Sequence, residues 1–176
     1  MVDPSRLAVY LVVGVAVVVV NNFVVLRWFV REREEHRKRY PSTCHDEADK
    51  AILHGPLLPA IGAIIMSSLI VPVFEEYIFR WPVFMVVGEH GYVPAMALAL
   101  LLSALFGWGH YKKKNGVSNI PRICILEYTL RGMTYCFAAI LTQSLWPCII
   151  GHVINNGRCD WALLRQRQTK ENRPLA

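Results

Sequence analysis

Apolar runs long enough to cross a lipid bilayer constrain the fold of this chain more than any other feature. The first run, Leu7 to Leu26, is interrupted only by Asn21 and Asn22. Its length of about 20 residues is what the hydrocarbon core of a membrane requires. Further apolar runs follow, and hydrophobic residues make up 54% of the 176 residues, more than in an ordinary soluble domain. The sequence therefore predicts an all-α, polytopic membrane helix bundle of about five transmembrane helices.

The domain organisation depends on whether the first apolar run is kept. A signal peptide is the alternative, but the run exceeds a usual signal h-region and no small-x-small cleavage pattern precedes Arg27. We therefore expect a retained membrane anchor. The predicted units are an anchor at 1–26, a charged cytosolic linker at 27–56, a helical core at 57–164 and a polar tail at 165–176.

The net charge of +6 reflects membrane topology better than nucleic-acid binding. Seven Lys and Arg lie within 27–50, four within 112–122 and five within 158–173, which is 16 of the 19 cations. The turns around 88–93 and 142–145 carry none. This alternation is the positive-inside pattern. It predicts a multi-pass membrane protein with a non-cytosolic amino terminus, a cytosolic carboxyl terminus and no nucleic-acid partner.

The second membrane helix is expected to begin near Leu57 and to continue through its charged residues to about Val87. A helix that ended before Glu75 would leave this carboxylate at one membrane face and His110 at the other, because each residue rises only 1.5 Å. Pro72 and Pro82 flank the charged turn and are expected to bend the helix. The remaining core helices are expected at about 93–111, 121–142 and 145–164.

Three charged side chains fall inside this second helix. Glu76 and Arg80 are four residues apart, so they share one helix face and can form an ion pair, which lowers the cost of two buried charges. Glu75 is rotated by about 100° from Glu76 around the helix and has no cation four residues away. Because charged residues at membrane depth usually mark a functional site, Glu75 is a candidate catalytic carboxylate. A purely structural Glu–Arg pair is the alternative.

Two later helices carry histidines with a partner at helical spacing. Phe106 lies one turn before His110, and His152 lies one turn before Asn156. His152 and Asn156 can both donate hydrogen bonds to a developing oxyanion. The alternatives are an interfacial role for His110 and a polar helix–helix contact for the second pair. If the three helices converge, these groups surround one buried polar site.

Other polar residues carry weaker signals. Glu127 and Arg131 form a further i, i+4 pair, which we interpret as structural. The five cysteines are odd in number and partly in apolar segments, so no disulfide framework is predicted. Cys44 and His45 with the distant His54 match no metal site, and we expect neither a metal nor another cofactor.

The three motifs together resemble the type II CAAX prenyl protease family, also called CPBP or Abi. They read FEEYIFR at 74–80, LFGWGH at 105–110 and SLWPCIIGHVINN at 144–156, in the order and spacing typical of the family. The resemblance covers roughly 57–164. It implies a glutamate-dependent endopeptidase that uses neither a metal nor an acyl-enzyme.

The resemblance also implies roles for individual residues. Glu75 and His110 would activate a water, His152 and Asn156 would form the oxyanion hole, and Glu76, Arg80 and Phe106 would support them. The implied partners are the lipid bilayer and a membrane-associated protein or peptide substrate, prenylated or not. A homo-oligomer is a further alternative, because a second copy of the chain could cover a site that so few helices leave open.

Three other functions remain as alternatives. Zinc could be bound by His110, His152 and Glu75, although no HExxH motif is present. A non-catalytic scaffold or a bacteriocin-immunity-like binding protein would use the same polar pocket without chemistry. A transporter is less favoured, because the chain shows no inverted repeat.

Overall fold

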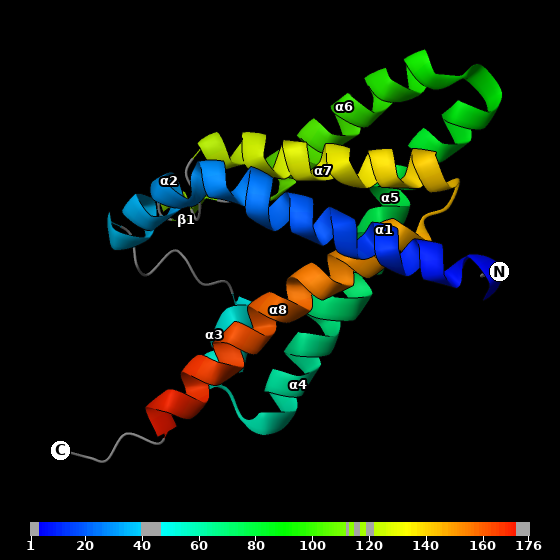
Figure 1. Cartoon of the computed structure of the whole chain (residues 1–176). Coiled ribbons are helices and arrows are strands. Elements are labelled where there is room, and N and C mark those ends of the chain that lie inside the picture. The colour runs from blue at the N-terminus through cyan, green and yellow to red at the C-terminus, as the bar shows by residue number, and fades with distance from the viewer. Residues whose placement is uncertain (1–3, 40–46, 112, 115–116, 119–121, 172–176) are drawn as a thin grey trace.

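The computed structural model describes residues 4–39, 47–111, 113–114, 117–118 and 122–171. Most of these residues are helical, and they also include one antiparallel ladder of two-residue strands, in which β1 (Lys113–Lys114) pairs with β2 (Val117–Ser118). The prediction of an all-α membrane bundle is thus confirmed (Figure 1). The helices are, in chain order, α1 (Leu7–Val19), α2 (Leu26–Arg39), α3 (Glu47–His54), α4 (Leu57–Ile65), α5 (Val71–His90), α6 (Tyr92–Gly109), α7 (Ile123–Thr142) and α8 (Trp146–Glu171), with a short 3-10 turn at Pro4–Arg6.

The first membrane helix is longer than its apolar run. A π-helical turn, Val20–Val25, joins α1 to α2 without a break, so the helix continues beyond the predicted boundary at residue 26 to Arg39. The residues after Leu26 are charged but contain no glycine or proline, and charge alone does not end a helix. The segment expected as a linker is therefore helical over α2 and again over α3.

The second membrane helix runs from Leu57 to His90 through the charged residues, as predicted. A π-helical turn, Met66–Ile70, lies between α4 and α5. Pro72 is the second residue of α5, while Pro82 lies inside α5 and does not end it. Because proline cannot donate a backbone hydrogen bond, the wide turn falls where the regular helical pattern must change.

Close helix contacts are made at glycines. A Cβ atom on Gly107 of α6 would lie 2.5 Å from the Ile125 carbonyl oxygen of α7, and one on Gly132 of α7 would lie 2.9 Å from Ser103 of α6. Gly14 of α1 and Gly151 of α8 form a similar contact. The absence of side chains lets each pair of backbones approach.

A single residue connects α5 to α6. Gly91 has a φ of +82°, a left-handed conformation that favours glycine because it has no Cβ atom. Its backbone N–H donates to the Val87 carbonyl oxygen at 3.2 Å. The two helices therefore form a tight hairpin, and the chain returns along α6 to the end of the bundle from which α5 came.

Four helical segments of the described residues are long and apolar enough to cross a membrane: 7–32, 57–90, 92–109 and 123–142. The helix α8 is long enough but more polar, since His152, Asn156 and Asp160 lie within it. It also continues to Glu171 rather than ending near Leu164, because no proline or glycine follows until Pro174. It nevertheless packs along α1 and against α5 and α7 in the bundle.

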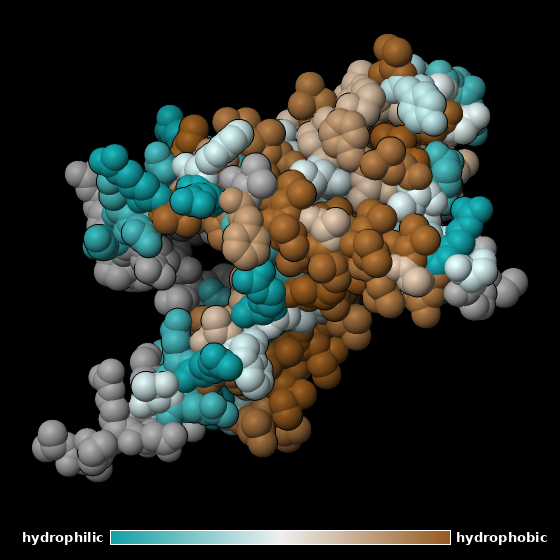
Figure 2. Space-filling view, in the orientation of Figure 1, coloured by the Kyte–Doolittle hydropathy of each residue, from teal (hydrophilic) through white to brown (hydrophobic). Residues whose placement is uncertain are grey.

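The surface of the molecule combines an apolar belt with polar ends. Exposed leucine, valine, isoleucine and aromatic side chains lie on α1, α4, α5, α6 and α7. In the space-filling view, polar side chains gather at the end that holds α2 and the last turns of α8 (Figure 2). Buried apolar clusters lie between α1, α7 and α8, between α5, α6 and α7, and between α3, α4 and α8. This distribution is that of an integral membrane protein.

Candidate functional site

The candidate site is built around an imidazole that joins two helices. His152 of α8 lies with its Nδ1 atom 2.7 Å from Glu76 Oε1 of α5. A carboxylate only accepts hydrogen bonds, so Nδ1 carries a hydrogen and donates a hydrogen bond to Glu76. Glu76 is completely buried and its second oxygen lies 3.2 Å from Arg80 Nε, one helical turn away. The predicted Glu76–Arg80 ion pair is present, and it holds His152 in one orientation.

Glu75 faces the other nitrogen of the same ring. Glu75 Oε2 lies 3.5 Å from His152 Nε2, and its side chain is 24% exposed while that of Glu76 is fully buried. The difference follows from the rotation of about 100° between neighbouring residues of a helix. One imidazole thus contacts both glutamates of the first motif, and Glu75 is the more open of the two.

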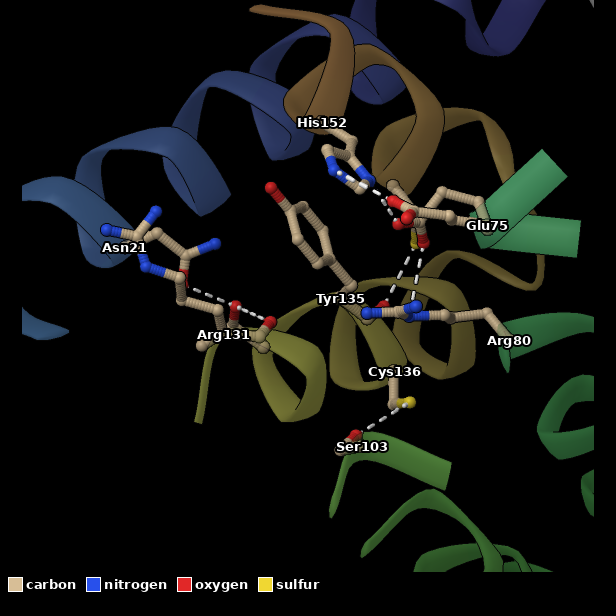
Figure 3. Close-up of polar contacts among 11 residues, drawn as sticks. Asn21, Glu75, Arg80, Ser103, Arg131, Tyr135, Cys136 and His152 are labelled. Atoms are coloured by element: carbon tan, nitrogen blue, oxygen red, sulfur yellow. Dashed lines mark hydrogen bonds and ion pairs between the residues drawn. The ribbon is translucent and has the colours of Figure 1, made fainter. Parts of the chain in front are cut away.

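Aromatic rings enclose the charged groups. The guanidinium carbon of Arg80 lies 4.5 Å from the centre of the Phe106 ring and 5.4 Å from that of Tyr135. The Tyr135 ring stacks on His152 with ring centres 5.3 Å apart, and lies between His152 and Arg80 (Figure 3). Among the described residues, Nη1 and Nη2 of Arg80 have no hydrogen-bond partner, so cation–π contacts take the place of some hydrogen bonds.

His110 reaches this cluster from the end of α6. Its ring lies 4.4 Å from the Phe106 ring and stacks on Tyr128 at the same distance, while Phe106 in turn lies 6.1 Å from His152. His110 Nδ1 lies 2.8 Å from the Phe106 carbonyl oxygen, one of the carbonyls that a helix end leaves unpaired. A carbonyl only accepts, so Nδ1 donates, and in the neutral ring Nε2 keeps its lone pair.

Asn156 lies one turn after His152 on α8, and its amide is directed towards the π-helical turn of the second membrane helix. Asn156 Nδ2 donates to the Ser67 carbonyl oxygen at 2.9 Å. Because this oxygen can only accept, the contact fixes which end of the amide is nitrogen. The predicted hydrogen-bonding pair of His152 and Asn156 therefore makes contacts with two different parts of the second membrane helix.

Sequence reasoning missed a third polar residue on the same face of α8. Asp160 follows Asn156 by four residues, is buried, and accepts hydrogen bonds from Ser67 Oγ at 2.6 Å and from Ser68 Oγ. The repeated spacing of four residues from His152 through Asn156 to Asp160 is a signal that could have found it. Tyr135 was missed as well, and the sequence has no comparable signal for it.

A second group of polar contacts lies between the π-helical turn Val20–Val25, α7 and α8. Thr134 donates to the buried Asn21 at 2.7 Å, and Asn22 donates to Asn155 at 3.1 Å. The Glu127–Arg131 ion pair of α7 is also buried, with a distance of 2.9 Å. The contacts of Asn21 and Asn22 attach the first membrane helix to α7 and α8.

The described residues include no group of three or more His, Cys, Asp or Glu side chains arranged to hold a metal ion. His54 is exposed near the end of α3, whereas Cys44 and His45 lie outside the described residues. The last predicted tail residues, 172–176, and part of the basic segment after His110 also lie outside them.

Comparison with known proteins places these motifs in a family. The family model described as type II CAAX prenyl endopeptidase Rce1-like matches residues 57–158, which include all three motifs. The chain is also 31% identical over 93 residues to "Putative membrane peptidase YdiL" of Bacillus subtilis (strain 168). The match covers 53% of the chain and 34% of that protein, so the chain spans about a third of its length.

No solved structure matches the chain significantly. The family match covers more than half of the 176 residues and extends from the start of α4 past His152 and Asn156 of α8 to residue 158. The chain belongs to the type II CAAX prenyl endopeptidase Rce1-like family.

Proposed function

We propose that the chain is a metal-independent intramembrane glutamate endopeptidase that cleaves a peptide bond of a membrane-associated protein or peptide. The observation that carries this proposal is the position of His152 between the two motif glutamates of α5, with Arg80 behind Glu76. Family membership supports peptide-bond hydrolysis at a membrane.

In the proposed reaction, Glu75 and His110 hold the attacking water. Glu75 is the more exposed of the two motif glutamates. His110 Nδ1 donates to the Phe106 carbonyl oxygen, so Nε2 is the nitrogen that can accept a hydrogen bond from the water. Glu75 takes a proton from the water as the water oxygen attacks the scissile carbonyl carbon. It then returns a proton to the amine as the carbon–nitrogen bond breaks.

The negative oxygen of the tetrahedral intermediate requires hydrogen-bond donors, and we assign His152 and Asn156 to this role. With both ring nitrogens protonated, His152 would bring the summed charge of Glu75, Glu76 and Arg80 to zero, which lowers the cost of burial. Its Nε2 would then donate. The amide of Asn156 has two hydrogens, so the contact with Ser67 leaves a second hydrogen for the oxyanion.

The remaining assignments follow from the contacts of the site. Glu76 and Arg80 orient His152, and Phe106 packs between Arg80 and the two imidazoles. We propose peptides that end in a CAAX-type sequence as substrates, because the family is described by that activity. Comparison of prenylated and unmodified peptides tests whether the cysteine of the CAAX-type sequence must be prenylated.

The central prediction concerns Glu75. Wild-type protein, Glu75→Gln and Glu89→Gln are reconstituted in liposomes and given the same CAAX-type peptide in farnesylated and unmodified forms. The Glu75→Gln variant should lose about 100- to 10,000-fold in cleavage rate, the range expected for a general base. Glu89→Gln makes the same substitution at an exposed position of α5 and should cleave like the wild type. Peptide products are quantified by mass spectrometry.

Two outcomes would contradict the proposal in different ways. Unchanged cleavage by a folded Glu75→Gln variant would exclude the glutamate mechanism. Loss of cleavage on treatment with 1,10-phenanthroline, with recovery on adding zinc, would favour the metalloprotease alternative. Binding of the peptides without cleavage, unaffected by Glu75→Gln or His110→Ala, would favour the non-catalytic binding protein.

A further inference from the structure

The π-helical turn Met66–Ile70 contacts α8 at two successive turns. At one level, Asn156 Nδ2 donates to the Ser67 carbonyl oxygen. At the next level, the Asp160 carboxylate accepts hydrogen bonds from Ser67 Oγ and Ser68 Oγ. Asp160 is only 6% exposed, so these bonds form away from bulk water, where a hydrogen bond is electrostatically stronger than in water.

The Ser67 carbonyl, which Asn156 contacts, lacks a backbone donor in the register of this turn. Within the turn the Val71 N–H pairs with the Met66 carbonyl, five residues earlier. The next donor in the same register would be residue 72 for the Ser67 carbonyl, but Pro72 has no N–H. Asn156 supplies the missing donor. The position of the Asn156 side chain therefore depends on the position of the Ser67 carbonyl oxygen, which the turn determines.

We propose that Asp160 is a positioning residue, which fixes the π-helical turn through Ser67 and Ser68 and thereby sets the position of Asn156. The inference rests on the proposed function, in which Asn156 donates to the oxyanion. Asp160 lies two residues beyond the segment matched by the family and belongs to none of the three motifs. Among the described residues, its carboxylate accepts its hydrogen bonds from Ser67 and Ser68 of the turn, so it acts through Asn156.

The geometry also indicates that the acceptor oxygen of Asp160, rather than its negative charge, holds the turn. Both serine hydroxyls donate to the same oxygen, Asp160 Oδ2. A carbonyl-type oxygen has two lone pairs and can accept both bonds without a negative charge. The Asp160→Asn variant, in which the amide oxygen takes the place of Oδ2, should therefore keep the turn and Asn156 in place, whereas Asp160→Ala removes the acceptor.

The first test is a kinetic comparison in liposomes with the cleavage assay described above. Asp160→Ala should lower kcat by about 100-fold with little change in KM, the scale expected when a catalytic group moves by about 1 Å. Asp160→Asn should stay within a few-fold of the wild type. Gln166→Ala, an exposed position on the same helix, is the control. Equal loss in Asp160→Asn and Asp160→Ala would overturn the proposal, because the charge would then be the essential property.

A double-mutant cycle separates positioning from general destabilisation. In an Asn156→Ala background, Asp160→Ala should change kcat by no more than about twofold, the usual error of additivity, because the residue through which it acts is already absent. A full additional loss of about 100-fold would mean that Asp160 acts independently of Asn156, and it would overturn the inference.

A second readout does not require turnover. Hydrogen–deuterium exchange of the segment around Met66–Ile70 should accelerate in Asp160→Ala and remain at the wild-type level in Asp160→Asn and Gln166→Ala. Unchanged exchange in Asp160→Ala would overturn the inference even if the enzyme is active. Faster exchange together with a wild-type protein that cleaves no peptide would instead count against the proposed function, while the contact between Asp160 and the turn would stand.

Discussion

Arg80 shows at the residue scale how the charged site is tolerated inside a bundle of apolar helices. Its side chain is completely buried, its charge is balanced by Glu76 one turn earlier, and the Phe106 ring covers the guanidinium. Because removal of one partner leaves the other charge buried alone, such pairs are costly to break even where they add little stability when intact. The pair thus orients His152, and the fold depends on its staying complete.

Replacement of Arg80 tests this dependence. Arg80→Met should lower the free energy of unfolding by about 3–5 kcal/mol, because Glu76 is then buried without its cation. Arg31→Met is the matched control, since Arg31 forms an exposed i, i+4 ion pair with Glu35 at 2.9 Å and its loss should leave stability unchanged. Unfolding of both variants is followed in detergent. Similar stability of the two variants would show that the Arg80 charge is not required.

The residues of the three motifs could be found from sequence, whereas several of their contacts could not. The i, i+4 spacing of Glu76 and Arg80 predicted a pair that is present. The contact between Asn156 and the Ser67 carbonyl depends on a π-helical turn, and helical periodicity alone gives no sign of one. Asp160 was overlooked because a carboxylate near the end of an apolar run resembles a residue at the membrane surface. The catalytic roles stay predictions until the variants are assayed.

At the scale of helices, glycine positions decide how closely the site can be assembled. Gly107 precedes His110 by less than one turn, and its α-carbon faces the backbone of α7. At the neighbouring Gly109, no heavy atom of the described residues lies within 4 Å of the place where a Cβ atom would lie. The same residue type on the same helix therefore has a packing function at one position and none at the other.

This contrast gives a prediction about a single methyl group. Gly107→Ala should destabilise the protein by about 1–3 kcal/mol, the usual cost of overpacking, because the Ile125 carbonyl is backbone and cannot rotate away. It should also reduce cleavage, since α6 carries His110. Gly109→Ala should leave both properties unchanged. Thermal unfolding and the peptide assay measure the two effects, and equal behaviour of the two variants would contradict the close contact of α6 and α7.

The existence of the membrane helices could be predicted from apolar runs, but their ends could not, and neither could α3. Leu26 and Leu164 mark where the sequence becomes charged, and both α2 and α8 continue for one or more further turns. Hydrophobicity reports where a helix leaves the apolar layer, while the end of the helix depends on backbone-breaking residues. At Gly91, where such a residue is present, the predicted turn and the observed one coincide.

At the scale of the whole molecule, the arrangement of charge bears on orientation. The described basic residues of α2, of β1 and of the last turns of α8 lie at one end of the bundle (Figure 1). The α5–α6 turn lies at the other end and carries no lysine or arginine. The positive-inside rule predicts that the first end faces the cytosol. We therefore keep the proposal of a non-cytosolic amino terminus and a cytosolic carboxyl terminus.

Epitope tags at the two ends of the chain test this orientation. In sealed vesicles that expose the cytosolic face, added protease should remove the carboxyl-terminal tag and spare the amino-terminal tag. Detergent should make both accessible, which controls for tags that are resistant in themselves. Protection of the carboxyl-terminal tag, or cleavage of both tags before detergent, would contradict the proposed topology.

The single-residue connection at Gly91 has a mechanical consequence for the chemistry. Glu75 and His110 lie on the two arms of one hairpin, far from the residue that joins them. At 1.5 Å per residue, α6 is a lever of about 27 Å, so a swing of about 2° at the pivot shifts its tip by about 1 Å. A displacement of that size is enough to change a reaction rate by about 100-fold. The backbone conformation of Gly91, on the side of the bundle opposite the site, thus sets the distance between Glu75 on α5 and His110 at the end of α6.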